Sequence, residues 1–408
     1  PRARPRMTLL FLHQNMPGQF KHLAPALARD PANKVVFVTR RDGFDMPGVR
    51  RVTYQTTRTA QAATHHYVRL YENCVLHGQA VVRACQELAR EGFRPDVVVA
   101  HPGWGEALFV RDVFPRAAIL NYCEFYYHGE GADVGFDPET PADLDAVCRA
   151  RARNAHLLLS LESCDHGLSP TQWQRDQHPA PLRGKISVIF DGIDTGIVRP
   201  DPAARFTLPD GGVLTAADEV VTYVARNLEP YRGFPSFMRA VPAILRARPA
   251  ARVVIVGGDA VSYGQSAPDG QSWRARMLAE VGPLDPARVH MLPPLRYHDY
   301  LSLLRVSTAH VYLTVPFVLS WSCMEALAAG CLLVGSDTPP VREVVEHGRN
   351  GLLADFLNPA DIAGRVAEAL ANRAAMAPLR ARARETVLSR YDLAHCLPAQ
   401  MRLVASLA

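Results

Sequence analysis

The amino-acid sequence predicts an α/β protein made of two doubly wound parallel-sheet domains in tandem. Short β-rich runs alternate with longer amphipathic segments, which is typical of a parallel sheet covered by helices. The alternation stops at the turn-rich stretches Asp191–Asp194 and Pro200–Pro202 and then starts again. With 408 residues, 48% of them hydrophobic and 21% charged, the chain is long and apolar enough for two globular domains. We therefore expect a domain over residues 7–195, a second over residues 196–389, and a C-terminal helix over residues 390–408 that packs back on the first.

The first domain is expected to begin with a strand and to continue as alternating strands and helices. Strands are predicted at Leu9–Gln14, Val35–Thr39, Arg51–Tyr54, Asp96–Ala100, Ala118–Tyr122, His166–Ser169 and Ile186–Phe190. Helices are predicted at Gln19–Arg29, Ala60–Arg90, Gly105–Val113 and Pro141–Ser163.

The second domain repeats the pattern. Strands are predicted at Val220–Val224, Arg252–Val256, Val289–Leu292, His310–Leu313 and Leu332–Gly335. Helices are predicted at Gly233–Ala247, Ser272–Val281, Tyr297–Arg305, Trp321–Ala329, Val341–Glu346 and Pro359–Ala371. Because ligands of doubly wound sheets bind at the carboxyl ends of the strands, both domains are expected to present their loops to a central cleft.

The segment after the first strand of the second domain carries two arginines, Arg226 and Arg232, with Gly233 opening the next helix. The guanidinium group is a planar fork of donors that suits phosphate and stays charged at any working pH. At the carboxyl end of a strand, the pair predicts an anion site. The alternative interpretation is a surface loop with two salt-bridged arginines.

A second segment predicts a helix that begins at Ser320 and carries Glu325 on a small, apolar surface. Ser320 is a suitable N-cap, and the free amides at such a helix start bind anions. A carboxylate in apolar surroundings needs donors. Two vicinal ribose hydroxyls would supply them, and so would a neighbouring arginine in a purely structural role.

Several motifs occur in a family-specific order. They are Ser169-Pro-Thr, Asp191-Gly-Ile-Asp194, Arg226-x5-Arg232-Gly-Phe, Val254-Ile-Val-Gly257-Gly258, Glu325-Ala-Leu-Ala-Ala-Gly330 and Gly335-Ser-Asp-Thr-Pro-Pro-Val-Arg-Glu343. Together they resemble the retaining glycosyltransferases of family 4, which have the GT-B fold. The resemblance implies an N-terminal acceptor-binding domain and a C-terminal domain that binds a nucleotide-sugar donor.

The resemblance also assigns roles to individual residues. Arg226 and Arg232 match the basic pair that grips the donor diphosphate, and Glu325 matches the glutamate that binds the nucleotide ribose. Eight residues earlier the family has another glutamate, which contacts the donor sugar, whereas this chain has Phe317. The main chain of residues 318–321, which are Val318, Leu319, Ser320 and Trp321, is expected to hold the sugar and the β-phosphate.

The family likeness reaches the first domain and the second strand of the second domain. Gly18 stands where relatives have a glycine-rich loop near the donor phosphate, and Gly257 belongs to the expected donor site. His101 resembles a histidine that lines the sugar pocket, and a neutral imidazole can bond a hydroxyl or carry a proton. A loop histidine bonded to nearby backbone is the alternative. For His65, His66, Arg69 and His77 we favour a solvated helical face.

The resemblance implies transfer of a hexose-type sugar, with retention of configuration, from a nucleoside-diphosphate sugar to an acceptor hydroxyl. A UDP-sugar is the expected donor, and neither a cofactor nor a metal is expected. Asp143 and Asp145 form the only D-x-D motif, and we assign them to the first turn of a helix, where acidic residues match the dipole. An epimerase or sugar phosphorylase of the same fold and a non-catalytic nucleotide-sugar-binding protein are the alternatives.

Composition limits the location and the partners. The net charge of +5 is spread through Arg-rich helices, which argues against nucleic acid as a partner. The eight cysteines form no C-x-x-C pair, which indicates reduced thiols in a cytoplasmic protein. Peripheral contact with the inner face of the membrane stays open, as does the acceptor, whether a glycan, a lipid-linked sugar, a protein or a small molecule. We expect Met7 to be the natural start and residues 1–6 to be an extension.

Overall fold

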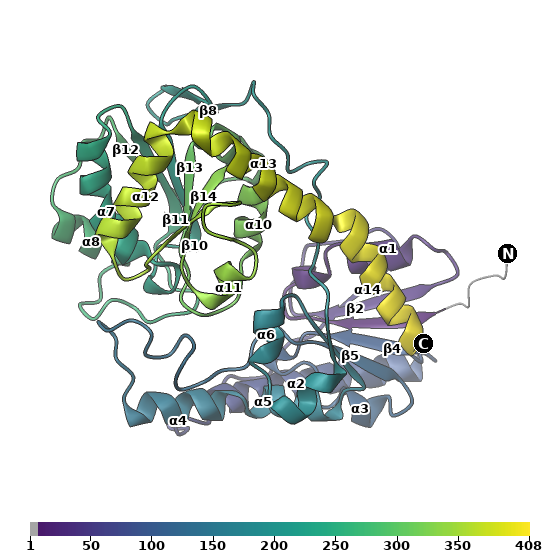
Figure 1. Ribbon diagram of the computed structural model, residues 1–408. Coiled ribbons are helices and arrows are strands. Elements are labelled where there is room, and N and C mark those ends of the chain that lie inside the picture. Colours follow the sequence, from purple (N-terminus) through teal and green to yellow (C-terminus); the bar gives the residue numbers. More distant parts are fainter. Residues whose placement is uncertain (1–6) are drawn as a thin grey trace. The chain divides into compact units, whose positions relative to one another are not determined.

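The computed structural model describes residues 7–408, so the expected extension over residues 1–6 lies outside the described residues (Figure 1). The chain forms two compact units. Unit 1 contains the chain up to Gly192 together with Ala394–Ala408, and unit 2 contains Ile193–Leu393. No helix of the described part is long and apolar enough to cross a membrane.

Unit 1 is built on a seven-stranded parallel sheet with the strand order β3-β2-β1-β4-β5-β6-β7. The strands are β1 (Thr8–Leu12), β2 (Lys34–Thr39), β3 (Val49–Thr53), β4 (Val97–Ala100), β5 (Ala118–Tyr122), β6 (His166–Ser169) and β7 (Ile186–Val188). Most are short continuous apolar runs, as expected for parallel strands that are buried on both faces.

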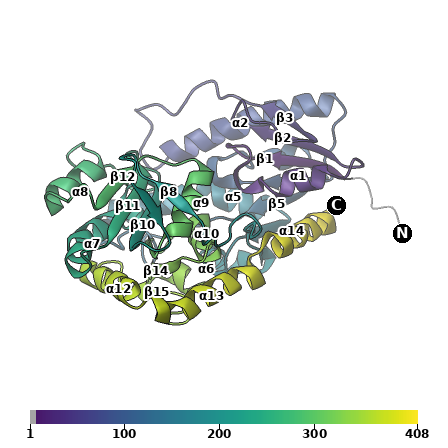
Figure 2. The same cartoon turned by 90° about the horizontal axis from the view of Figure 1, so that it is seen from above.

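Alternate side chains of these strands enter two separate cores. Leu10 and Leu12 of β1 lie in the core that contains helices α2 (Arg69–Arg90) and α5 (Ala155–Ser163). Leu9 and Phe11 lie in the core that contains α1 (Leu23–Ala28). Val404 of α14 (Leu393–Leu407) lies in the same core as Leu9, so this helix covers one face of the first sheet. Figure 2 shows α14 beside α1.

The helices of unit 1 cover these two faces. They are α1 (Leu23–Ala28), α2 (Arg69–Arg90), α3 (Val110–Val113), α4 (Leu144–Arg153), α5 (Ala155–Ser163), α6 (Gln172–Asp176) and α14 (Leu393–Leu407), with short 3-10 turns at Gly18–Phe20, Pro102–Trp104 and Ala180–Lys185.

Unit 2 contains a six-stranded parallel sheet with the order β12-β11-β10-β13-β14-β15, and a separate two-stranded hairpin. The sheet strands are β10 (Val220–Asn227), β11 (Arg252–Gly258), β12 (Val289–Leu292), β13 (Ala309–Tyr312), β14 (Leu332–Ser336) and β15 (Leu352–Ala354), and the hairpin strands are β8 (Arg205–Thr207) and β9 (Val213–Thr215). The helices are α7 (Phe234–Ala247), α8 (Trp273–Val281), α9 (Tyr297–Val306), α10 (Trp321–Ala328), α11 (Pro339–Arg342), α12 (Pro359–Ala371) and α13 (Arg373–Arg390), with a 3-10 turn at Pro230–Arg232.

All four predicted helices of unit 1 are shorter than expected or interrupted, and two of them have a visible local cause. The helix expected over residues 141–163 breaks at Asn154, whose side chain bonds both the N–H and the C=O of Tyr127, at 2.8 and 2.7 Å. The helix expected from Gly105 starts only at Val110. Gly105 has a φ of 100°, and a Cβ there would lie 2.2 Å from the carbonyl oxygen of Cys74.

Both sheets reverse their strand order next to the first strand, between β1 and β4 in unit 1 and between β10 and β13 in unit 2. Such a switch point leaves a crevice outside the carboxyl ends of the two central strands, where doubly wound proteins bind ligands. Each unit therefore has one place where its fold favours a site.

Candidate functional site

The switch point of unit 2 holds a cavity of about 90 Å³. Its walls come from the ends of β10 and β13, from the loop after β10, and from the start of α10. Arg226, Arg232, Ser320 and Ser322 line it. The structure therefore brings together the two arginines and the helix start that the sequence singled out.

Arg232 is half-buried and has only neutral partners. Its Nη1 atom donates to the hydroxyls of Tyr312 and Thr314, at 3.3 and 2.9 Å, and to the carbonyl oxygen of Val318, at 3.2 Å. Within the described residues, no carboxylate pairs with it. Burial alone would lower the pKa of this guanidinium, but the neighbouring tyrosines, Tyr312 first, raise it above its usual value, so the positive charge persists.

Arg226 lies near the end of β10, beyond the regular pairing with β11 that stops at Val224, and lines the same cavity with an exposed side chain. In the part of the chain that the structure describes, its guanidinium has neither an ion-pair nor a hydrogen-bond partner. Two cations without protein counter-charges thus share one cavity. The half-buried charge of Arg232 in particular calls for an anion, and the exposed Arg226 beside it adds a second positive charge.

Glu229 lies between the two arginines in sequence and is buried, but its charge is already matched. Its carboxylate accepts hydrogen bonds from the main-chain N–H groups of Ser262, Tyr263 and Gly264, at 3.0–3.2 Å. This contact holds the loop after β11 so that the guanidinium carbon of Arg232 lies 5.4 Å from the ring centre of Tyr263. Neither Glu229 nor Tyr263 was anticipated from the sequence.

Ser320 caps α10, as expected. Its Oγ accepts from the N–H of Ser322 at 3.2 Å. Its own N–H, however, donates to the Tyr312 hydroxyl at 2.9 Å, and the carbonyl of Val318 accepts from Arg232. The main chain at these two residues is therefore engaged within the protein, contrary to the expectation of free amides at Ser320. Leu319 is buried, and Trp321 is partly exposed at the first turn.

Glu325 is 7% exposed, and two tyrosines of α9 supply its donors. The hydroxyls of Tyr297 and Tyr300 donate to its two oxygens, at 2.9 and 3.0 Å. Neither tyrosine was among the residues that the sequence singled out. Glu325 does not line the cavity, and Tyr297, one of its two donors, is 51% exposed.

Phe317 is buried in an aromatic cluster with Tyr231 and Tyr263, at ring-centre distances of 5.5 and 5.2 Å. Position 317, where the family resemblance leads us to expect a glutamate, therefore contributes an apolar side chain that packs against the Tyr263 loop. Gly257 lies outside the cavity lining. A Cβ on it would meet Leu228 at 2.6 Å, so its absence of a side chain serves the packing of β11 on the loop after β10.

In unit 1, His101 follows β4 directly, at the switch point, and is buried. Its Nδ1 accepts from the N–H of Gly103 at 3.1 Å, which places the ring proton on Nε2. That atom faces the Oε2 of Glu124 at 3.5 Å. The ring stacks on Trp104 and Tyr122.

A chain of polar side chains continues from Glu124 to His13, whose ring centre lies 4.9 Å from that of His101. Gln19 accepts from the Nε2 of His13 at 2.7 Å and donates to Glu124 at 2.8 Å. Burial, and then the nearby His101, lower the pKa of His13 to about 3, so this ring is neutral. For Glu124, burial opposes the charged form, but His101, His13 and Gln19 outweigh it and lower the pKa.

Gly18 has a structural role in this arrangement. Its φ of +51° is left-handed, and a Cβ would lie 2.3 Å from the Nε2 of His13. The structure thus places Gly18 against a histidine that was not among the candidates from the sequence.

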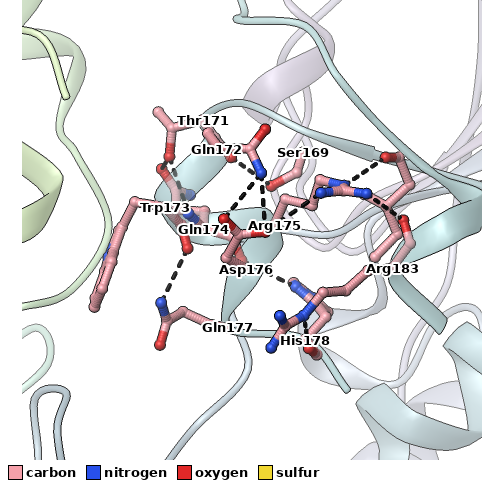
Figure 3. Close-up of polar contacts among 11 residues, drawn as sticks. Ser169, Thr171, Gln172, Trp173, Gln174, Arg175, Asp176, Gln177, His178 and Arg183 are labelled. Atoms are coloured by element: carbon pink, nitrogen blue, oxygen red, sulfur yellow. Dashed lines mark hydrogen bonds and ion pairs between the residues drawn. The ribbon is translucent and has the colours of Figure 1, made fainter. Parts of the chain in front are cut away.

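The Ser169-Pro-Thr motif is linked by hydrogen bonds to the loop that carries Glu124. Thr171 caps α6 through the N–H of Gln174, and Gln174 donates to the carbonyl of Glu124 at 2.7 Å. Figure 3 shows how Arg175 extends this network to the carbonyl of Arg183, at 3.0 Å. The motif therefore fixes the main chain that carries Glu124.

The remaining candidates have local partners. Asp143 caps α4 by accepting from Ala146 at 2.7 Å, and Asp145 accepts from Tyr67 at 2.8 Å, which agrees with their assignment to a helix start. The solvated helical face expected for four residues was wrong in part: His65 and His66 precede α2, and His77 lies on α2 but is buried, with its Nδ1 3.1 Å from the Tyr54 hydroxyl. Among the described residues, no three His, Cys, Asp or Glu side chains group as metal ligands would.

Two family models match the chain. The model described as "Glycosyl transferase family 4 group" matches residues 31–198, and the model described as "Glycosyl transferases group 1" matches residues 212–387.

Among curated proteins, the chain is similar to D-inositol 3-phosphate glycosyltransferases. The protein from Nocardioides sp. is 30% identical over 206 residues, which cover 47% of this chain and 42% of the relative. The protein from Acidothermus cellulolyticus is 28% identical over 194 residues, which cover 46% and 40%. The matches thus span less than half of the curated relatives' length.

Solved structures share the fold over nearly the whole chain. The Anabaena protein HepE in complex with UDP and glucose has a TM-score of 0.69 at 16% identity, and covers 98% of this chain and 100% of its own. Sucrose-phosphate synthase from Thermosynechococcus elongatus has a TM-score of 0.72 at 19% identity, with 98% and 99% coverage.

Proposed function

The chain belongs to the family 4 group of glycosyltransferases with the GT-B fold, and on this premise we propose that it transfers a sugar from a nucleoside-diphosphate sugar to an acceptor hydroxyl. The single observation that carries the proposal is the cavity at the switch point of unit 2, where Arg226 and Arg232 lack counter-charges within the described residues. This cavity would receive the donor diphosphate.

The chemistry of the reaction matches this charge distribution. When the glycosidic bond to the nucleotide breaks, negative charge grows on the leaving diphosphate. The half-buried guanidinium of Arg232 is held by Tyr312, Thr314 and Val318, so it need not reorganise to stabilise that charge. Such preorganised charges usually contribute more to catalysis than any other single effect. The start of α10 adds the positive end of a helix dipole. These groups supply the counter-charge that a metal would otherwise provide, so we propose a metal-independent reaction.

We propose a UDP-hexose as the donor and retention of configuration as the outcome. Structures of Anabaena HepE are described in complex with UDP and with UDP-glucose, and this fold neighbour supports the choice of donor. Retention is supported by the resemblance to family 4. In that scheme the leaving phosphate assists deprotonation of the acceptor from the same face of the sugar, and no enzyme nucleophile is needed.

A binding experiment tests the donor site. UDP binds only the folded chain, so it should raise the melting temperature of the wild type by mass action. The rise should be largely lost in Arg232→Ala and kept in Arg246→Ala, which removes an exposed arginine of α7 outside the cavity. An equal rise in all three proteins would contradict the proposal.

A product assay then separates the reaction classes. Incubation with UDP-glucose and a panel of acceptors should give UDP and a glycosylated product with retained configuration. Release of UDP and an altered free sugar without acceptor would indicate an epimerase, and transfer that needs free phosphate would indicate a phosphorylase. Donor binding without transfer or slow hydrolysis would indicate a binding protein, for which Phe317 in place of the usual glutamate offers a rationale.

A further inference from the structure

A second cavity, of about 110 Å³, lies in unit 1 beside His101. Its walls come from residues of the stretches 101–104, 121–127 and 153–161, together with Leu70 and His178. These are the loops after β4 and β5 and the junction between α4 and α5. The aromatic rings of Trp104, Tyr122 and Tyr127 form much of its lining.

Among the residues that the structure describes, Arg153 is the only arginine or lysine that lines this cavity. It is half-buried, and its guanidinium carbon lies 3.9 Å from the ring centre of Tyr127. Within the described residues, the guanidinium has no ion-pair or hydrogen-bond partner. Glu124 supplies the only carboxylate of the lining in the described part of the chain, and it is already engaged by Gln19 and His101. The charge of Arg153 is therefore unmatched.

Three buried polar atoms without a hydrogen-bond partner belong to residues that line the same cavity. Two of them face no partner of any kind in the described structure, the Oδ1 of Asn121 and the Nδ1 of His156, whereas the third, the Nε2 of His101, faces the Oε2 of Glu124 at 3.5 Å. The side chains of Asn121 and His156 are each anchored through their other polar atom, to the carbonyls of Ser160 at 2.7 Å and Gly103 at 3.1 Å. Each unpaired buried group costs about 1–3 kcal/mol, so their clustering indicates a polar ligand.

The histidines of the cavity provide hydrogen bonds and little charge. Burial lowers the pKa of His156 to about 4 and that of His178 to about 4, so both rings are neutral near pH 7. Neutral imidazoles, an amide oxygen and flat aromatic faces suit a compound with several hydroxyl groups. The fixed charge of Arg153 suits an anionic group on it, because a guanidinium matches phosphate and carboxylate geometry.

We propose that this cavity binds the acceptor, and that Arg153 recognises a phosphate or carboxylate group on a polyhydroxylated acceptor. The identity of the ligand as an acceptor rests on the proposed function. The anion site itself is inferred from the cavity alone and does not depend on the proposed function.

Binding of defined probes tests the site. Isothermal titration of the full chain with glucose 6-phosphate, glucuronate and glucose is carried out with and without saturating UDP, which occupies the arginine cavity of unit 2. We expect at least one anionic probe to bind 10-fold or more tightly than glucose, and the tighter anion identifies the group. Arg153→Gln should weaken that binding at least 10-fold. Arg151→Gln, on an exposed arginine of the same helix outside the cavity, should change it less than twofold.

Two results would overturn the inference. One is equal binding of glucose and both anions to the wild type. The other is unchanged anion binding in Arg153→Gln. Arg153 would then serve only as a positive charge at the carboxyl end of α4 and would not bind the ligand. Arg153→Lys keeps the charge and should lose less affinity than Arg153→Gln, so it decides the question if the glutamine variant does not fold. Should UDP fail to bind, the proposed function falls, while the comparison without UDP still decides this inference.

Discussion

The Nε2 atom of His101 faces the Oε2 atom of Glu124 at 3.5 Å, although the two residues follow different strands, β4 and β5. The Gly103 amide fixes the tautomer of the histidine, and Gln19 holds the other oxygen of the glutamate. The Nε2–H group of His101 can therefore donate to a substrate oxygen that enters beside the carboxylate, whereas its Nδ1 is occupied by the Gly103 amide.

We therefore predict that Glu124→Gln lowers kcat by about 10-fold or more, because the carboxylate that orients and supports His101 is lost. The pKa of Glu124 is held below its ordinary value, so the wild-type group stays ionised and the loss should be uniform from about pH 6 to about pH 8. Steady-state rates across this range check the prediction. The exposed Glu130→Gln should match the wild type.

Arg226→Ala and Arg232→Ala should each lower turnover by a factor of order 100 or more, because each removes a positive charge that meets the developing diphosphate charge. Initial rates with a nucleotide-sugar donor check this, with Arg246→Ala as the control. Wild-type rates in both cavity variants would reject the proposed donor site.

Glu229→Gln should release the Tyr263 loop. The amide cannot accept from three N–H groups as the carboxylate does, and a hydrogen bond to a charged group contributes about 1.5–3 kcal/mol. Amide hydrogen exchange at residues 262–264 should become about 10-fold faster or more. Asp269→Asn changes an acidic residue of the same loop that does not contact these amides, and should leave their exchange unchanged.

Gly18→Ala and Gly43→Ala form a matched pair. Both glycines have positive φ, +51° and +77°, but only at Gly18 does a Cβ collide with a neighbour, the ring of His13. Gly43→Ala should lower the free energy of unfolding by about 1–2 kcal/mol for the left-handed backbone alone. Gly18→Ala should lower it further and reduce activity, as measured by urea denaturation and rates. Equal losses would show that the contact with His13 is unimportant.

Stability should also depend on the charge of Glu106. This carboxyl is fully buried, with Tyr54 donating to it at 2.5 Å, and burial raises its pKa from 4.5 to about 7. The folded protein thus keeps a proton that the unfolded chain releases. The contribution to stability is full below about pH 4.5 and is lost as the pH rises through about 7, by up to about 3 kcal/mol. Glu106→Gln should abolish this part of the pH dependence, whereas the exposed Glu162→Gln should retain it.

The sheet strands and the arginine cavity were largely predictable because their signals are local. Arg226 and Arg232 lie at the end of a strand and just after it. The alternation of strands and helices alone is enough to predict that this strand borders the switch point. Strands β8, β9 and β15 were missed because three residues each are too few to show a period, and α13 was missed because its Arg-rich sequence buries only Met376, Ala383 and Val387. The helix expected from Ala60 begins at Arg69, since residues 60–68 form turns.

Partners that are distant in sequence could not be predicted. Gln19 and Glu124 are separated by 105 positions, and their contact follows from the spatial neighbourhood of β1, β4 and β5. The tyrosines of Glu325 and the aromatic neighbours of Phe317 likewise depend on how α9 and the Tyr263 loop pack. Each missed residue lies near the end of a strand or on a neighbouring helix. There, the sequence pattern predicts which element a residue belongs to, but it does not predict which distant side chain that residue contacts.

Unit 1 is discontinuous, because Ala394–Ala408 joins it after the whole of unit 2. During synthesis from the N-terminus, the face of the first sheet that receives Val404 and its neighbours stays uncovered until residues 394–408 have left the ribosome. The nascent first half therefore carries an exposed apolar surface for the time needed to translate about two hundred residues. The position of α14 in the sequence thus sets how long this apolar face waits for its cover.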